Sequence, residues 1–441
     1  MMKRRNFLKL IAAGVTAKGA ANMGGVRGEA KRNVFLLSQH GCSRATGYAE
    51  TNKIVSIGDK THVAWLDSVK DGFRVRVRTL DRKKNAWSPI YTVGEAYDNH
   101  GGPALSCDSE GHLHIVYYPH HHPFRYRRST RPNDASQWEK EIQFGKKCTY
   151  PTLLAGEDDT LYLTCRESHV DPWVVGLYTK RHGKDWVRER TIMAARDKGY
   201  SHFQEAMVWG RDHRTIHLST RMYGGKPGRA HTVGYMKSPD SCKTWQRADG
   251  TPIALPATQD TIDRIDSDQG KGNRTFRCGS IALGSGDTPY ILYSDASKRP
   301  PAVFVAKPGE GAWEKASLVR SIETVCPNWW AAMPGGLAFG LDGRAHVCLT
   351  AEPAPKNSTS KAAGWGEEKQ EVLWLTSPDL FKSVKGRLVS SIDPHCPHWL
   401  PNIEHPTGHH SFSLPGIVYT AGSRGDKNTD VVSNEVYWVE I

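Results

Sequence analysis

The stretch GEDDTLYLTCR, residues 156–166, contains the two signals that decide the fold. Gly and Asp form a tight turn, and apolar residues then occupy every second position, which is typical of a strand with one buried face. The same combination recurs as DSEGHLHIVYY (108–118), GRDHRTIHLSTR (210–221), GSGDTPYILYS (284–294) and GLDGRAHVCLT (340–350). One β module is therefore repeated along the chain.

A second repeated element follows each module: a polar turn that ends in tryptophan. One such turn, SPDSCKTW (238–245), is close to the Asp-box pattern S-x-D-x-G-x-T-W, with Cys242 in the place of glycine. Repeats at spacings of roughly 50 to 70 residues indicate four-stranded blades around an axis. The turns end at Trp87, Trp138, Trp186, Trp245 and Trp313.

The fold class that we predict is all-β: a seven-bladed β-propeller of four-stranded antiparallel blades, forming a single domain over residues 31–441. A two-sheet sandwich is the alternative, but it would not repeat the tryptophan turn so often. The predicted blades span residues 34–90, 98–140, 148–188, 200–247, 275–315, 328–384 and 396–440.

Residues 1–30 have the pattern of an export signal. Lys3-Arg4-Arg5-Asn6-Phe7-Leu8-Lys9 is a twin-arginine sequence, and a mild apolar stretch and small residues follow it. The apolar stretch is too short, and is interrupted by Lys18, so we expect no membrane span. We expect a periplasmic or secreted protein, and the alternative is a disordered basic tail.

The charge of the chain favours an anionic partner. Removal of residues 1–30, with six lysines and arginines and one glutamate, lowers the formal net charge from +13 to +8. Export and the absence of a Lys/Arg-rich arm argue against nucleic acid. An acidic polysaccharide and an anionic lipid surface remain as partners that the charge favours, and the polysaccharide is the partner that we expect. We also expect a monomeric protein.

The nine cysteines include no CxxC pair, and several lie in strand patterns, where buried thiols are usual. A disulfide framework is not required, although one or two bridges remain open. Histidines and cysteines near residues 395–410, with His169, His202 and Cys278 elsewhere, match no fixed ligand spacing. We expect no cofactor in catalysis, leave a structural zinc or calcium ion open, and assign no metal ligand.

Polar residues gather where the strands of three successive blades begin or end. Such groups interrupt the apolar alternation, which is costly unless they face a wet cleft. Because the innermost strands of a propeller line one channel, residues at equivalent positions of adjacent blades converge. The residues concerned are His100, the triplet His120-His121-His122, Tyr150, Arg166, Tyr200, His202 and Arg221.

Three stretches that contain or adjoin these residues resemble the BNR-type propeller family, which includes ulvan lyases and related rhamnose–uronate-cleaving enzymes. They are DNH (98–100), DSEGHLHIVYYPHHHPFRYRRS (108–129) and TYPTLLAGEDDTLYLTCR (149–166), within a resemblance over about 95–250. The residues at the family's motif positions are His100, His120, Tyr126, Ser129, Tyr150 and Arg166. The chain departs from the family at 167–170, where Glu-Ser-His-Val replaces a glycine-rich stretch, and the histidine triplet leaves the second histidine's register open.

The resemblance implies a polysaccharide lyase that cleaves an ulvan-like rhamnose–uronate glycan, and the residue types suit that chemistry. β-Elimination removes the C5 proton of a uronate, so an arginine that neutralises the carboxylate and a histidine–tyrosine acid–base pair are required. The alternatives are a propeller α-L-rhamnosidase and a non-catalytic glycan-binding propeller. The predicted catalytic residues are His100, His120, His121, Tyr150 and Arg166, and the predicted substrate-binding residues are Arg221, His202, Tyr200, Arg125 and Trp330.

Overall fold

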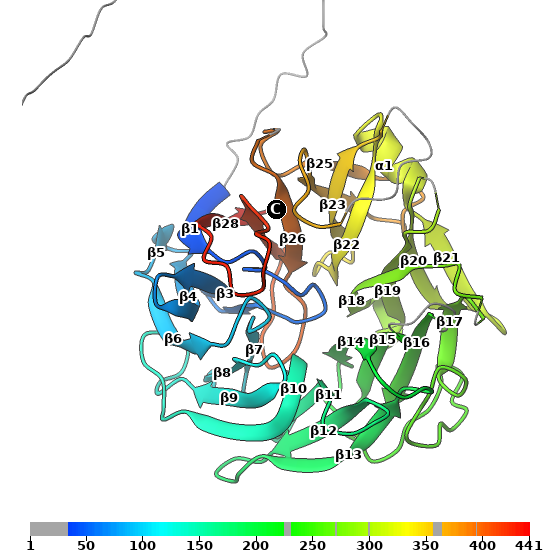
Figure 1. The fold of residues 1–441 in the computed structure, drawn as a ribbon, viewed down its shortest axis with the longest axis horizontal. Helices are drawn as coiled ribbons and strands as arrows, with labels where there is room; N and C mark the ends of the chain where they lie inside the picture. The colour runs from blue at the N-terminus through cyan, green and yellow to red at the C-terminus, as the bar shows by residue number, and fades with distance from the viewer. Residues whose placement is uncertain (1–33, 225–230, 270, 299, 356–363, 394) are drawn as a thin grey trace, which may run out of the picture. The chain divides into compact units, whose positions relative to one another are not determined.

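The computed structural model describes residues 34–224, 231–269, 271–298, 300–355, 364–393 and 395–441. The predicted twin-arginine signal, residues 1–30, lies outside the described residues. In Asn33–Ile441, antiparallel sheets stand around a common centre, as Figure 1 shows. The predicted all-β propeller is confirmed.

Three of the sheets have four strands each, connected in simple sequence order. This is the arrangement that the repeated turn-and-strand module predicts. The sheets are β14 (Ser201–Trp209), β15 (Ile216–Gly224), β16 (Thr232–Ser238) and β17 (Asp263–Ser267); β18 (Phe276–Leu283), β19 (Pro289–Asp295), β20 (Ala302–Pro308) and β21 (Trp313–Ser317); and β22 (Trp329–Phe339), β23 (Ala345–Pro353), β24 (Glu371–Ser377) and β25 (Lys385–Leu388).

A fourth sheet has seven strands because one long strand belongs to two neighbouring groups. The first part of β10 (Ile142–Ala155) pairs with β9, and its second part, from Cys148 onward, pairs with β11. The remaining strands are β7 (Ala104–Cys107), β8 (Leu113–Tyr117), β9 (His122–Arg128), β11 (Leu161–Glu167), β12 (Val174–Lys180) and β13 (Val187–Ala194).

The fifth sheet joins the two ends of the described chain. Strand β1 (Val34–Gly41) pairs along its length with β28 (Asn434–Glu440), but meets β3 only at Gly41 and Asp67. The prediction that residues 34–41 open the first blade is therefore wrong, because this strand completes the last one. The other strands are β2 (Ile54–Ile57), β3 (Lys60–Val69), β4 (Gly72–Asp81), β5 (Ala86–Trp87), β6 (Tyr91–Ala96), β26 (His398–Ile403) and β27 (Gly416–Ala421).

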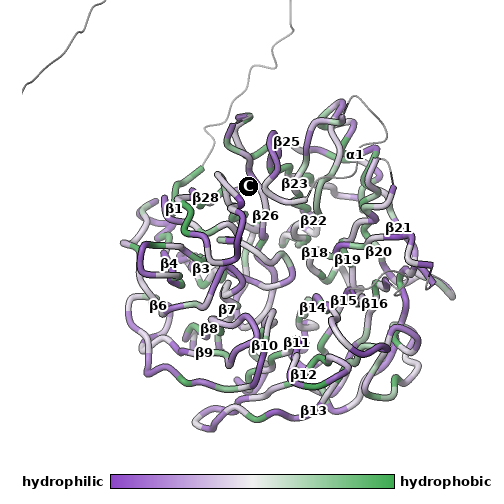
Figure 2. Tube along the Cα trace, viewed as in Figure 1, coloured by the Kyte–Doolittle hydropathy of each residue, from purple (hydrophilic) through white to green (hydrophobic). Residues whose placement is uncertain are grey.

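The number of blades stays a prediction, because two of these five sheets continue across blade boundaries. Figure 2 shows hydrophobic stretches within the strands and mostly hydrophilic loops between them, as expected for sheets that pack face to face. Large aromatic side chains fill the core, with Trp65, Trp399 and Trp438 fully buried.

The Asp-box resemblance at 238–245 is confirmed by its hydrogen bonds. Ser238 Oγ accepts from the backbone N–H of Cys242, and Asp240 accepts from Thr244. Cys242 has a φ of +70°, a conformation that favours the glycine of the usual pattern. The segment 377–383 makes the same turn with Ser377, Asp379 and Ser383, a repeat that our sequence analysis missed.

Helical structure is limited to α1 (Val319–Val325) and the 3₁₀ turn η1 (Ser285–Asp287) among the described residues. None of the described helices has the length and hydropathy needed to cross a membrane. All nine cysteines have free thiols.

Candidate functional site

Tyr150 lies where β10 begins its pairing with β11. The register of this pair shifts between Thr149 and Thr152, so Tyr150 lies in a bulge, and its φ is +61°. Bulges redirect side chains, and positive φ values are uncommon for residues other than glycine. The ring of Tyr150 is buried beside Tyr48, with centroids 4.7 Å apart, and beside His202, with centroids 5.0 Å apart.

Arg166 lies near the end of β11, one strand away from Tyr150. Its Cζ lies 4.6 Å from the centroid of the Tyr150 ring and 5.0 Å from that of Trp173. The side chain is 1% exposed, and its Nε and Nη1 atoms have no hydrogen-bond partner among the described residues. A buried guanidinium with unused donors is costly, so these atoms define a position where an anionic group is stabilised.

Asp98 holds two histidines. Its Oδ1 lies 3.2 Å from Nδ1 of His100, and its Oδ2 lies 2.6 Å from Nδ1 of His120. The two rings stack with centroids 3.8 Å apart. The histidine hydrogen bonds hold the pKa of Asp98 well below its usual value against the opposing effect of burial, so the carboxylate is ionised and accepts from both rings. Each Nδ1 therefore carries the proton that it donates, which leaves Nε2 as the position of the lone pair in the neutral form of either ring.

The hydrogen bonds of His121 differ from those of His100 and His120. Its Nε2 lies 3.4 Å from Nη2 of Arg166, which can only donate, and its Nδ1 lies 2.5 Å from Oγ of Ser168. The lone pair of His121 is thus directed at Arg166. His121 has a φ of +62°, a second unusual backbone conformation at this site.

Burial sets the protonation states of these groups. It lowers the pKa of His100 to about 4, and burial with the nearby charge of Arg166 lowers that of His121 to about 4. Burial raises the pKa of Tyr150, an effect that Arg166 opposes. At neutral pH the site therefore combines the neutral rings of His100 and His121 with a protonated tyrosine and a charged guanidinium.

The next blade extends the site. Nη2 of Arg221 lies 3.1 Å from Nδ1 of His202, and its Cζ lies 4.8 Å from the centroid of Tyr223. Burial lowers the pKa of His202 well below its usual value, and Arg221 acts in the same direction. Tyr200 is 47% exposed, beside Trp173 with ring centroids 5.0 Å apart. The structure therefore brings together eight of the ten predicted site residues.

Two predicted residues do not join this cluster. Arg125 lies with its Cζ 3.8 Å from the centroid of Tyr118, and its Nε is 3.4 Å from a carboxylate oxygen of Glu141, so its charge is already paired. Trp330 donates to Glu352 and lines a separate, largely apolar cleft of about 310 Å³. Trp330 is in β22, in a different sheet from β10, β11, β14 and β15, whereas Arg125 is in the same sheet as Tyr150 and Arg166 but contacts Tyr118 and Glu141.

Sequence reasoning missed several residues of the site. Asp98 belongs to the DNH stretch noted in the sequence, but it was not assigned to the site. Tyr48 and Arg44 come from the segment between β1 and β2, where Arg44 donates to the Tyr48 hydroxyl over 2.7 Å. Trp173 and Glu205 complete the set. Glu205 is buried, and its carboxylate oxygens have no hydrogen-bond partner in the part of the chain that the structure describes. Desolvation, with the charge of Glu50, raises its pKa to about 8.

Asp98, His100 and His120 also form the one three-residue group in the described part of the chain whose ligand atoms could hold a metal ion. These atoms lie within 4.8 Å of one another. The Nδ1 atoms of both histidines are already hydrogen-bonded to Asp98, so a metal bound through these nitrogens would have to replace both hydrogen bonds. The histidines near residue 405 make other contacts: His410 Nδ1 lies 3.7 Å from the Cys107 thiol, and His409 Nε2 lies 2.8 Å from a backbone carbonyl.

The fold and these motifs define a class of protein. The model of the BNR repeat-containing family matches residues 60–321, more than half of the chain. The protein therefore belongs to the BNR repeat-containing family.

Two curated relatives are described as ulvan lyases. One, of the PL25 type from Pseudoalteromonas sp. (strain PLSV), is 25% identical over 254 residues, covering 50% of this chain and 49% of the relative. The other, from Alteromonas sp. (strain LOR), is 24% identical over 248 residues, covering 46% and 49%. The chain thus spans about half the length of the curated relatives that it matches.

Solved structures show the same fold over most of the chain. The PL25 ulvan lyase bound to -[GlcA(1-4)Rha3S]- superposes with a TM-score of 0.68 at 13% identity, covering 91% of this chain and 94% of that one. The polysaccharide lyase Uly1 superposes with a TM-score of 0.58 at 10% identity, covering 92% and 98%. At these identities the superpositions establish the fold.

Proposed function

We propose that the protein is a polysaccharide lyase that cleaves an acidic, ulvan-like rhamnose–uronate glycan by β-elimination. The observation that carries this proposal is the buried guanidinium of Arg166, whose unused Nε and Nη1 donors lie beside neutral histidines and a tyrosine. The ulvan lyases among the relatives support the same class of substrate.

Arg166 neutralises the uronate carboxylate. Removal of the C5 proton moves charge onto this carboxylate, so a preorganised guanidinium stabilises the transition state more than the ground state. His121 positions Arg166, because its only free lone pair accepts from the guanidinium. We therefore assign it a positioning role in place of the acid–base role predicted from the sequence.

His100 and His120 are the candidate bases. Asp98 binds both Nδ1 atoms, so both Nε2 atoms carry lone pairs, and burial keeps His100 neutral at the pH of the reaction. Tyr150 is the candidate acid, because its raised pKa keeps the hydroxyl protonated until it is needed at the leaving O4. The guanidinium beside its ring stabilises the developing phenolate.

Arg221 and His202 are the candidate residues for the neighbouring sugar. Arg221 is held by His202 and by the carbonyl of Phe276, to which Nη1 donates over 2.8 Å. A fixed guanidinium of this kind suits a carboxylate or sulfate group.

The test is incubation with ulvan and a panel of other uronate polysaccharides. A lyase produces ultraviolet absorbance from the new C4–C5 double bond, together with new reducing ends. Reducing ends without absorbance would identify a hydrolase instead. Binding without either product would identify a glycan-binding propeller.

A further inference from the structure

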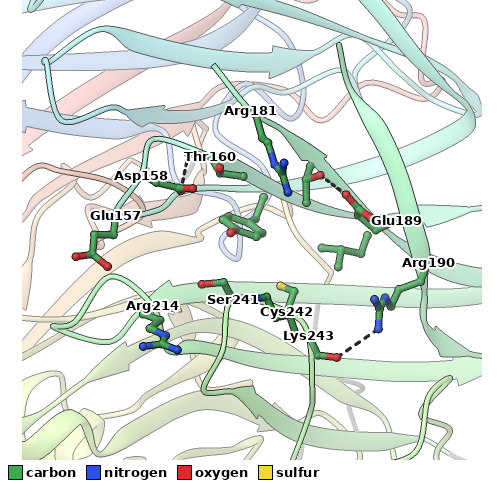
Figure 3. A pocket seen from close by; sticks show the side chains of 13 residues that line it. Glu157, Asp158, Thr160, Arg181, Glu189, Arg190, Arg214, Ser241, Cys242 and Lys243 are labelled. Atoms are coloured by element: carbon green, nitrogen blue, oxygen red, sulfur yellow. Dashed lines mark hydrogen bonds between the residues drawn. The ribbon is translucent and has the colours of Figure 1, made fainter. Parts of the chain in front are cut away.

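A second cleft opens at the other end of the same strands. It has a volume of about 860 Å³ and lies between the turns of two neighbouring sheets (Figure 3). Its walls come from the turn before β11, from β12 and β13, and from the turns that precede β15 and follow β16. The lining includes Glu157, Asp158, Thr160, Tyr162, Arg181, Glu189, Arg190, Arg214, Ser241 and Lys243.

This cleft is separate from the candidate active site. Thr160 immediately precedes β11, whereas Arg166 lies near the end of that strand. Seven residues of extended chain span about 20 Å, so the two sites are at opposite ends of the sheet. A ligand in the cleft cannot contact the reacting bond.

Its four basic residues are exposed and lack ion-pair partners in the described chain: Arg181, Arg190, Arg214 and Lys243. Two of the three acidic residues of the lining accept hydrogen bonds from neutral donors. Glu189 accepts from the hydroxyl of Thr179 over 2.5 Å, and Asp158 accepts from the backbone of Thr160 over 3.1 Å. The positive charges are therefore available to an external anion.

We propose that this cleft is a second binding site for the anionic polysaccharide, distinct from the site of cleavage. The ligand class rests on the proposed function. A volume of this size accommodates several sugar units. The four cations suit sulfate and carboxylate groups, while the carboxylates accept from sugar hydroxyls and disfavour a uniformly anionic polymer such as nucleic acid.

A second binding site would raise the apparent affinity of the protein for a polymeric substrate. A chain that is held in the cleft presents its other segments to the active site at a high effective concentration. The apparent affinity for the polymer then exceeds that for a short oligosaccharide, which can occupy one site at a time.

The chain offers a matched control. Lys243 occupies the Asp-box turn after β16, and Lys382 occupies the equivalent turn after β24. Arg214 and Arg344 likewise occupy equivalent turns, in which Asp212 and Asp342 accept from their backbone N–H groups. The pair R214E/K243E therefore alters the cleft, and R344E/K382E makes the same charge change on another blade.

The experiment measures retardation in gels containing ulvan or neutral dextran, with R166A as background so that the polymer is not cut. We expect R214E/K243E to weaken binding to ulvan at least fivefold and R344E/K382E to stay within twofold. Binding unchanged in both pairs, or equally weakened in both, would overturn the proposal. If R214E/K243E does not fold, R214Q/K243Q gives the same comparison against R344Q/K382Q.

Kinetics distinguishes this proposal from the proposed function. With Arg166 intact, R214E/K243E should raise KM for the polymer and leave kcat and the KM for a short oligosaccharide unchanged. A parent protein that forms no unsaturated product would contradict the lyase proposal, while the gel comparison would still decide whether the cleft binds an anionic glycan.

Discussion

The Nε2 atom of His121 accepts a hydrogen bond from Nη2 of Arg166 across 3.4 Å. Two members of the histidine triplet, His120 and His121, therefore have different hydrogen-bond partners. In the proposed mechanism His121 positions the guanidinium, whereas His120, which is hydrogen-bonded to Asp98, is a candidate base. Neighbours in the sequence therefore have different tasks, which the following predictions separate.

Arg166→Lys should retain the charge but lose the planar fork, so kcat should fall by roughly 10²-fold while the protein remains folded. The kcat of Arg166→Ala should fall further than that of Arg166→Lys. Its KM should change less than its kcat, because the interaction of Arg166 with the uronate strengthens as charge develops in the transition state. Steady-state kinetics on ulvan measures both. Arg188→Lys is the control, since Arg188 pairs with Glu167 outside the cluster; an equal loss there would contradict the assignment.

Tyr150→Phe should fold normally and lose kcat by about 10²- to 10⁴-fold, because the change removes only the hydroxyl that protonates O4. Thermal denaturation and kinetics are measured together. Tyr437→Phe, which loses a hydrogen bond to Glu435 away from the site, is the matched change. Turnover of Tyr150→Phe within a few-fold of the parent would transfer the acid role to a histidine.

Asp98→Asn should lower kcat at least about tenfold, because the amide can accept from only one of the two Nδ1 atoms and the other ring loses its tautomer. Asp108→Asn is the control: Asp108 binds His114 over 3.1 Å in the same manner but outside the cluster. It should affect stability more than kcat. Comparable kinetic losses in both variants would show that Asp98 has a structural role only.

Prolonged dialysis against EDTA should leave kcat unchanged, because Arg166 supplies the positive charge that a metal would otherwise provide. If an ion held by Asp98, His100 and His120 were needed, activity would fall on dialysis and return with added zinc or calcium. Metal content and turnover should be measured on the same sample.

Acidification from pH 7 to pH 4.5 should lower the melting temperature by several degrees. Burial lowers the pKa of seven histidines to about 4 or below, so the unfolded chain binds more protons between pH 6.5 and pH 4 and folding becomes less favourable as pH falls. Glu205 and Glu404, with pKa values raised to about 8 and about 7, act in the opposite direction but are fewer. The histidines are His62, His100, His121, His217, His231, His405 and His410.

Scanning calorimetry across this range tests the sign of the effect. His62 is distant in sequence from the site residues and is hydrogen-bonded to Thr79 and Asn133, so His62→Asn should reduce the slope of melting temperature against pH. A melting temperature that is constant or rises on acidification would contradict the prediction.

The sequence by itself determined the repeated module. Alternation of apolar residues and Gly–Asp turns is local, so stretches such as 156–166 show their strand character without the rest of the chain. Polar residues at strand ends were equally visible, because they break the alternation. This is why Tyr150, Arg166 and His202 could be predicted to lie together before their contacts were known.

Tertiary structure decided which strands and side chains meet. Strand β1 pairs with β28, about 400 residues away in sequence, because ring closure leaves the last blade short of a strand. Arg44 and Tyr48 join the site from a segment with no strand pattern, and Trp330 remains apart although its strand begins like the others. The hydrogen-bonding role of each histidine depends on Asp98, Arg166 and Ser168, and only spatial proximity reveals these partners.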